Sequence, residues 1–143
     1  MKADVNTSTA VIGVLNRYVD AVAKRDVEGV LELMAPDTET IVFGTGQDER
    51  RIGQDELKAQ LERDFSQSEK IYYEMGWRFV SSSGSVAWVA TEGVADIRAH
   101  GKKFHLPVRL TAVLEQHGDR WYFVQLHNSL PASGQRKGES FPD

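Results

Sequence analysis

The 143-residue sequence contains no cysteine. A disulfide, a cysteine nucleophile and a cysteine-based zinc site are therefore excluded together. No apolar run approaches the roughly 18 residues that a membrane-spanning helix needs. The first nine residues are polar, so we expect no secretory signal. These absences predict a cytoplasmic protein that does not act at a membrane.

Positive charge is also scarce, because 17 basic residues face 21 acidic ones and give a net charge of −4. The basic residues are scattered, whereas nucleic-acid binding requires lysine and arginine clusters that neutralise phosphates. We therefore expect no nucleic-acid partner. The four histidines lie on separate predicted turns and strands without a metal-binding spacing, so we expect no metal ion and no cofactor.

The length and the 41% hydrophobic content fit one globular domain with a substantial core. We place this domain at residues 1–132. Residues 133–143 follow the last predicted strand and are rich in glycine and polar side chains, which predicts a flexible C-terminal tail.

Three helices are predicted in the first half of the chain. The first spans residues 8–24, with Ser8 or Thr9 as its cap, and carries an apolar stripe formed by Val11, Leu15, Tyr18 and Val22. The second begins after Asp26, continues through Met34 and ends before Pro36. The third spans residues 54–67.

Strands dominate the second half of the chain. Two short strands, Thr38–Phe43 and Arg50–Ile52, precede four long ones that begin near residues 70, 85, 103 and 121. Alternation predicts one buried face in the first long strand, formed by Ile71, Tyr73, Met75, Trp77 and Phe79. We expect a bulge near Glu92–Gly93, and Pro107 implies a strand edge or a bulge. Helices followed by hairpin-linked strands predict an α+β fold.

The last two strands mix polar and aromatic side chains. His105, Arg109 and Thr111 alternate with aliphatic residues. On the last strand, alternation places Trp121, Phe123, Gln125, His127 and Ser129 on one face and Tyr122, Val124, Leu126 and Asn128 on the other. Such a mixture is typical of a pocket lining or of a subunit interface, and a bulge would exchange the faces.

Three stretches resemble the SnoaL-like branch of the nuclear transport factor 2 superfamily, over about residues 8–131. They are Arg17–Ala21 with the segment through Thr38, then Phe43–Glu49 with Ile52–Gly53, and finally Arg109–Val113 with Trp121 and His127–Pro131. The first is similar to ketosteroid isomerases. The last also resembles the association domain of calcium/calmodulin-dependent protein kinase II.

The resemblance implies a cone-shaped barrel, in which three N-terminal helices pack on a strongly curved antiparallel sheet of four to six strands. It also implies a pocket inside the cone and a homodimer formed through the outer face of the sheet. Steroid isomerisation is not expected. Tyr18 matches the family's tyrosine, but the position of the carboxylate base falls near Ile41–Phe43 and that of the acid falls near Arg109.

The resemblance and the polar pattern together select five candidate pocket residues, which are Tyr18, Trp88, Arg109, His127 and Asn128. An arginine within an apolar strand must be paired or bind an anion, so Arg109 either anchors a ligand, pairs with Glu92 or Asp96, or lies in the dimer interface. The expected ligand is small, partly apolar, and either neutral or anionic. The protein is either a cofactor-free isomerase or dehydratase, or a non-catalytic oligomerisation or ligand-sensing module.

Overall fold

The computed structural model describes residues 1–143 and confirms the α+β cone. The elements in chain order are α1 (Val5–Ala23), α2 (Val27–Leu31), β1 (Ile41–Phe43), β2 (Arg50–Ile52), α3 (Gly53–Ser66), β3 (Lys70–Ser83), β4 (Val86–Ala99), β5 (Lys102–His117) and β6 (Arg120–Ser129). They form three helices and one six-stranded sheet with the strand order β2-β1-β6-β5-β4-β3. Only β1 and β6 run parallel, and every other pair is antiparallel.

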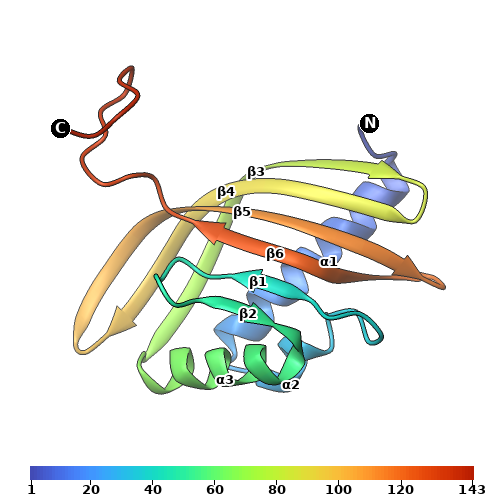
Figure 1. The fold of residues 1–143 in the computed structure, drawn as a ribbon, viewed down its shortest axis with the longest axis horizontal. Coiled ribbons are helices and arrows are strands. Elements are labelled where there is room, and N and C mark those ends of the chain that lie inside the picture. The colour runs from blue at the N-terminus through green and yellow to red at the C-terminus, as the bar shows by residue number, and fades with distance from the viewer.

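The helices cover one face of a curved sheet. In Figure 1, α1 crosses the long strands on one side, and α2 and α3 lie beneath β1 and β2. A core cluster of 23 buried residues fills the space between the helices and the sheet. The predicted stripe of α1 is part of it, because all four of its residues are buried.

Helix α1 begins one turn earlier than predicted. The carboxylate of Asp4 accepts a hydrogen bond from the Thr7 backbone N–H at 2.8 Å and caps the helix. The prediction of Ser8 or Thr9 as the cap is therefore wrong. Both of these residues lie inside the first turns of the helix.

Helix α2 begins as predicted but ends early. Asp26 caps it by accepting from the Gly29 backbone N–H at 3.0 Å. After Leu31 the chain leaves the helix to pair with Phe123 of β6, whose N–H donates to the Leu33 carbonyl at 2.8 Å. The N–H groups of Leu33 and Met34 bond to carbonyls three residues back, at 3.1 Å each, so the α-helix ends before the Met34 that the sequence predicted. Similarly, β1 begins only at Ile41 rather than Thr38.

Arg25 fixes the position of α3. It lies at the junction of α1 and α2 with a left-handed backbone (φ 59°). Its guanidinium donates to the carbonyls of Phe65 and of Ser68, the latter at 2.7 Å, and lies 5.1 Å from the Phe65 ring centre. The C-terminal end of α3 is thereby tied to the helical junction.

A bulge in β3 reverses which side chains face the core. Met75 pairs with Gly93 and Arg78 pairs with Thr91, so Gly76 and Trp77 together oppose one residue of β4. The bulge lies opposite Glu92 and Gly93 of β4, where the sequence predicted a bulge, but the extra residue belongs to β3. Gly93 lies so close to β3 that a Cβ there would be 2.1 Å from the Glu74 carbonyl oxygen.

This bulge contradicts the predicted single buried face of β3. Ile71, Tyr73 and Met75 point into the cone and pack on the core. Beyond the bulge, Trp77 and Phe79 point outward and are 58% and 46% exposed. The inner position passes to Val80, which is buried.

A second bulge, in β6, also reverses which side chains face the core. Phe123 pairs with Leu114 and Gln125 pairs with Val113, so Val124 is the extra residue. Trp121 and Phe123 face the core, and Leu126 and Asn128 continue the inner face after the bulge. The predicted face uniting Trp121 with His127 is therefore wrong.

The position of Pro107 follows a prediction. Pro107 lies in a part of β5 that pairs with β4 alone, because β6 pairing ends at Arg109. Pro107 thus lies at an edge of the sheet, where proline is tolerated. Residues 130–143 form no helix or strand and lead away from the body in Figure 1. No helix of the structure is long and apolar enough to cross a membrane.

Candidate functional site

A cavity of about 280 Å³ lies inside the cone, between α3 and the inner face of the long strands. One wall is apolar and is formed by Val42, Leu57, Leu61, Ile71 and Ile97. The other wall is polar and includes Tyr18, Tyr73, Asn128, Glu49, Arg51 and Asp64. This volume is just below the usual size range of ligand pockets, which is about 300–1,000 Å³.

Two of the five predicted residues, Tyr18 and Asn128, line this cavity. The Tyr18 ring stacks on Tyr73 at 6.4 Å and meets the edge of Phe123 at 5.9 Å. Burial raises the pKa of the Tyr18 phenol far above its usual range, nearby Tyr73 adds to this, and the Asn128 side chain offsets part of it. Burial also raises the pKa of Tyr73, to about 12. Both phenols therefore remain protonated and able to donate hydrogen bonds.

The other three predicted residues lie on the outer face of the sheet. The Trp88 side chain lines an outer groove rather than the cone. Arg109 is exposed, and its Nη2 donates to the Leu130 carbonyl at 3.3 Å. His127 is exposed beside Phe43, with ring centres 5.1 Å apart. The structure thus separates these three from Tyr18 and Asn128.

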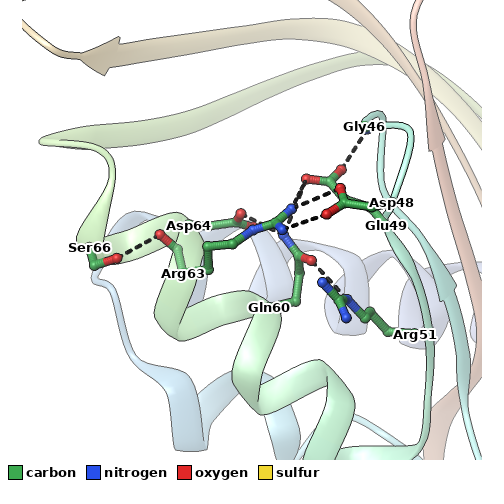
Figure 2. A network of polar contacts seen from close by, with 8 residues as sticks. All are labelled: Gly46, Asp48, Glu49, Arg51, Gln60, Arg63, Asp64 and Ser66. Carbon is green, nitrogen blue, oxygen red and sulfur yellow. Dashed lines mark hydrogen bonds and ion pairs between the residues drawn. The ribbon is translucent and has the colours of Figure 1, made fainter.

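Gln60 organises the polar wall of the cavity. Its side chain is only 6% exposed. Its Oε1 accepts from Arg51 Nε at 2.9 Å, while its Nε2 donates to Asp64 Oδ1 at 2.7 Å and to Glu49 Oε1 at 3.2 Å (Figure 2). Because both ends of the amide are engaged, Arg51 and Asp64 are held at fixed positions on either side of it.

Arg63 fastens the β1–β2 hairpin to α3. It donates to Asp48 at 2.8 and 3.3 Å and to Glu49 at 3.2 Å (Figure 2). These bonds hold the pKa of the Asp48 carboxyl below its usual range. Glu49 also accepts from the Gly46 N–H at 2.6 Å. A Cβ at Gly44 would meet the Glu49 side chain, so a larger residue there would displace that carboxylate.

Asp64 is a partly buried carboxyl that lines the cavity from α3. Burial raises its pKa above the ordinary value of 3.8, the Gln60 hydrogen bond opposes this, and nearby Glu49 adds to it. A carboxyl in this state retains its proton closer to neutral pH than an exposed one does. Such a group can give or take a proton during a reaction.

The raised pKa of Asp64 predicts how stability changes with pH. The folded state binds the Asp64 proton more tightly than the unfolded chain does, and this stabilises the fold. The stabilisation is fully present below about pH 4 and is lost as pH rises through the pKa of Asp64 in the folded state. Asp64→Asn is neutral at every pH and still accepts from Gln60. Its melting temperature should therefore gain a few degrees relative to wild type between pH 4 and pH 8.

Calorimetric melting at both pH values measures this difference. Glu62→Gln, on the exposed side of the same helix, is the matched control and should show no such trend. A difference between Asp64→Asn and wild type that stays constant from pH 4 to pH 8 would contradict the assignment.

Sequence reasoning missed Asp64, Gln60 and Arg51. A signal was present on α3, because Gln60 and Asp64 fall at the spacing of Leu57 and Leu61 and so lie on the buried face of the helix. Polar residues on an apolar stripe mark a network or a pocket. For Arg51 the sequence carries no such signal, since it lies in a short charged strand.

The outer face of the sheet carries a second hollow, a groove of about 410 Å³ across β3, β4, β5 and β6. Trp77, Phe79 and Trp88 line it together with smaller side chains that include Ala90 and Val113. All three aromatic rings are substantially exposed. An apolar patch of this kind is typical of an interaction surface.

No group of three or more histidine, aspartate or glutamate side chains is arranged to hold a metal ion. The cone cavity is lined by two carboxyls, two phenols, three amides and one guanidinium.

The sequence model of the SnoaL-like domain family matches residues 11–133. No curated protein matches the sequence. Among solved structures, a candidate dehydratase of the NTF2-like family from Streptomyces avermitilis is 18% identical, with a TM-score of 0.80 over 91% of this chain and 100% of that one. A candidate calcium/calmodulin-dependent protein kinase II association domain from Xanthomonas campestris is 21% identical, with a TM-score of 0.78 over 92% and 95%.

A third similar structure is a candidate scytalone dehydratase from Novosphingobium aromaticivorans. It is 14% identical, with a TM-score of 0.78 over 96% of this chain and 93% of that one. At these identities the likeness establishes a common fold, on which different activities can be built.

Proposed function

Because the chain belongs to the SnoaL-like domain family, as its sequence predicted, we propose that it binds a small, partly apolar ligand inside the cone. The observation that carries this proposal is a cavity of about 280 Å³ with an apolar wall facing a polar one. Gln60 and Arg63 hold the polar wall in place. A ligand that fits has an apolar body and one end with hydrogen-bonding groups.

The reaction type that these groups support is a cofactor-free proton transfer, as in an isomerase or a dehydratase. Asp64 is suited to hold or release the proton, because its raised pKa brings it closer to neutral pH. Tyr18 and Tyr73 can donate hydrogen bonds to an oxygen that becomes negatively charged. The names of the two dehydratase-like structures are consistent with this type of reaction. On β1, where a steroid isomerase would carry its base, Val42 lines the cavity.

We also propose that the outer groove is covered by a second copy of the chain, in a two-fold symmetric dimer. The exposed aromatic rings of the groove supply the apolar centre of such an interface. Arg109 stands opposite Glu92 on the neighbouring strand without forming an ion pair, so both charges are available to a partner. A two-fold axis would bring such opposite charges together.

A crossed pair of variants separates the two proposals. Ala99→Phe fills the cone cavity and should abolish binding of phenylacetate, a probe with an apolar ring and one charged end, while leaving association unchanged. Ala90→Glu places a charge in the outer groove and should weaken association at least about tenfold, while leaving phenylacetate binding unchanged. Titration calorimetry measures the binding, and analytical ultracentrifugation measures the association.

The opposite pattern would contradict both proposals. If Ala90→Glu lost phenylacetate binding and Ala99→Phe kept it, the ligand site would lie on the outer face. A monomeric wild-type protein at high concentration would contradict the dimer and leave the cone proposal in place.

A further inference from the structure

Arg51 forms no ion pair with any side chain of the protein. It lies on β2, half-buried, and lines the cavity. No carboxylate oxygen lies within 4.0 Å of its guanidinium nitrogens, because none of the ion pairs of the structure includes Arg51. A guanidinium that is partly removed from water binds an anion more strongly than a fully exposed one does.

The nearest carboxylates are already engaged elsewhere. Glu49 takes three donors, which are the Gly46 N–H, the Gln60 amide and the Arg63 guanidinium. Asp48 is bound by Arg63 through two hydrogen bonds. Both carboxylates of the hairpin are therefore bound by Arg63, and Arg51 lines the cavity without a carboxylate partner.

Gln60 sets the direction of the Arg51 guanidinium. The amide oxygen accepts from Nε at 2.9 Å, and no hydrogen bond engages the two terminal nitrogens. The opposite end of the amide holds Asp64 at 2.7 Å, so Gln60 lies between the positive group and the pocket carboxyl. The free edge of the guanidinium can thus bind an anion while Gln60 keeps its hydrogen bonds to Arg51 and Asp64.

We propose that Arg51 binds the carboxylate of a small carboxylic acid whose apolar body packs against the Leu57, Leu61 and Ile97 wall. This inference rests on the proposed function of the cone, and it names the class of ligand. The planar end of a guanidinium matches a carboxylate through two parallel hydrogen bonds. A phosphate is disfavoured, because its additional charge and third oxygen would face Glu49 and Asp64 in a cavity of only about 280 Å³.

Calorimetric titration with phenylacetate and with phenylacetamide, its neutral isostere, tests the inference. Wild type should bind the carboxylate at least about tenfold more tightly than the amide. Arg51→Met should weaken phenylacetate binding about 10- to 100-fold and leave phenylacetamide binding nearly unchanged. Arg50→Met is the matched control, because Arg50 is exposed on the same strand and does not line the cavity.

The outcomes separate this inference from the proposed function. Equal binding of both probes by wild type, abolished by Ala99→Phe, would overturn the role of Arg51 and leave the cone as the ligand site. Unchanged phenylacetate binding in Arg51→Met would also overturn the role of Arg51 and leave the cone as the ligand site. If neither probe bound wild type, or if Ala99→Phe had no effect on binding, the proposed function would fail together with the inference.

Discussion

Replacing Gly93 with alanine is expected to destabilise the protein by about 3 kcal/mol or more, which lowers the melting temperature by about 10 °C. A Cβ at this position would lie 2.1 Å from the Glu74 carbonyl oxygen and 2.8 Å from Met75 Cα. Both atoms belong to the backbone of β3, so no side-chain rotation can relieve the clash. The paired strands would have to separate at the bulge that bends the sheet.

Gly76→Ala is the matched control for this prediction. Gly76 lies across the same bulge, but a Cβ there would meet only the Glu92 carbonyl oxygen, at 3.6 Å. This is an ordinary contact, so the change in unfolding free energy should stay within about 1 kcal/mol. Urea unfolding of both variants measures the two effects. Equal stability of Gly93→Ala and wild type would show that the strands do not approach as closely as described.

The second large effect is expected for Phe123→Ala, at about 3–5 kcal/mol. Phe123 is fully buried on β6, and its ring lies at 5.9 Å from that of Tyr18. Truncation leaves a cavity beneath Tyr18, and the surrounding helices and strands can fill it only in part. The backbone bonds of Phe123 to Leu33 and Ala35 remain. The loss therefore measures packing of the ring rather than strand pairing.

Phe104→Ala, at an exposed position of β5, serves as the control and should cost no more than about 1 kcal/mol. Chemical denaturation of the two variants at one pH gives both values. A cost for Phe123→Ala as small as that for Phe104→Ala would mean that the ring is not in the core. The arrangement of the wall behind Tyr18 would then have to be revised.

The sequence predicted the elements of the fold well, because each element has a periodicity of its own. The stripe of Val11, Leu15, Tyr18 and Val22 is sufficient to identify α1. The long alternating segments identify the strands. Hairpin connections then favour an antiparallel sheet, and the resemblance to the SnoaL-like family supplied the cone.

The faces of two strands could not be predicted, because a bulge adds a residue without changing the composition. Trp77 continues the alternation of Ile71, Tyr73 and Met75 in the sequence, yet it lies on the other face of the sheet. In the same way, Val124 moves His127 away from the face of Phe123. Backbone geometry, rather than side-chain pattern, determines these positions.

The sequence predicted cavity residues only where a single element or the family resemblance is enough to place them. Tyr18 lies on a single helix, and Asn128 follows from the family resemblance. Arg51, Gln60 and Asp64 come together only because the β1–β2 hairpin is fastened to α3 through Arg63. From the sequence, we predicted that Arg109 would be a buried arginine that must be paired or bind an anion. In the structure Arg109 is exposed, and Arg51 is the half-buried arginine that lines the cone cavity without an ion pair.

A crystal structure of the protein with bound phenylacetate tests the central claim most directly. We expect the ring of the probe against the apolar wall of the cone and its carboxylate on the terminal nitrogens of Arg51. Phenylacetate bound in the outer groove beside Trp77 and Trp88, with the cone cavity unoccupied by the probe, would contradict the account.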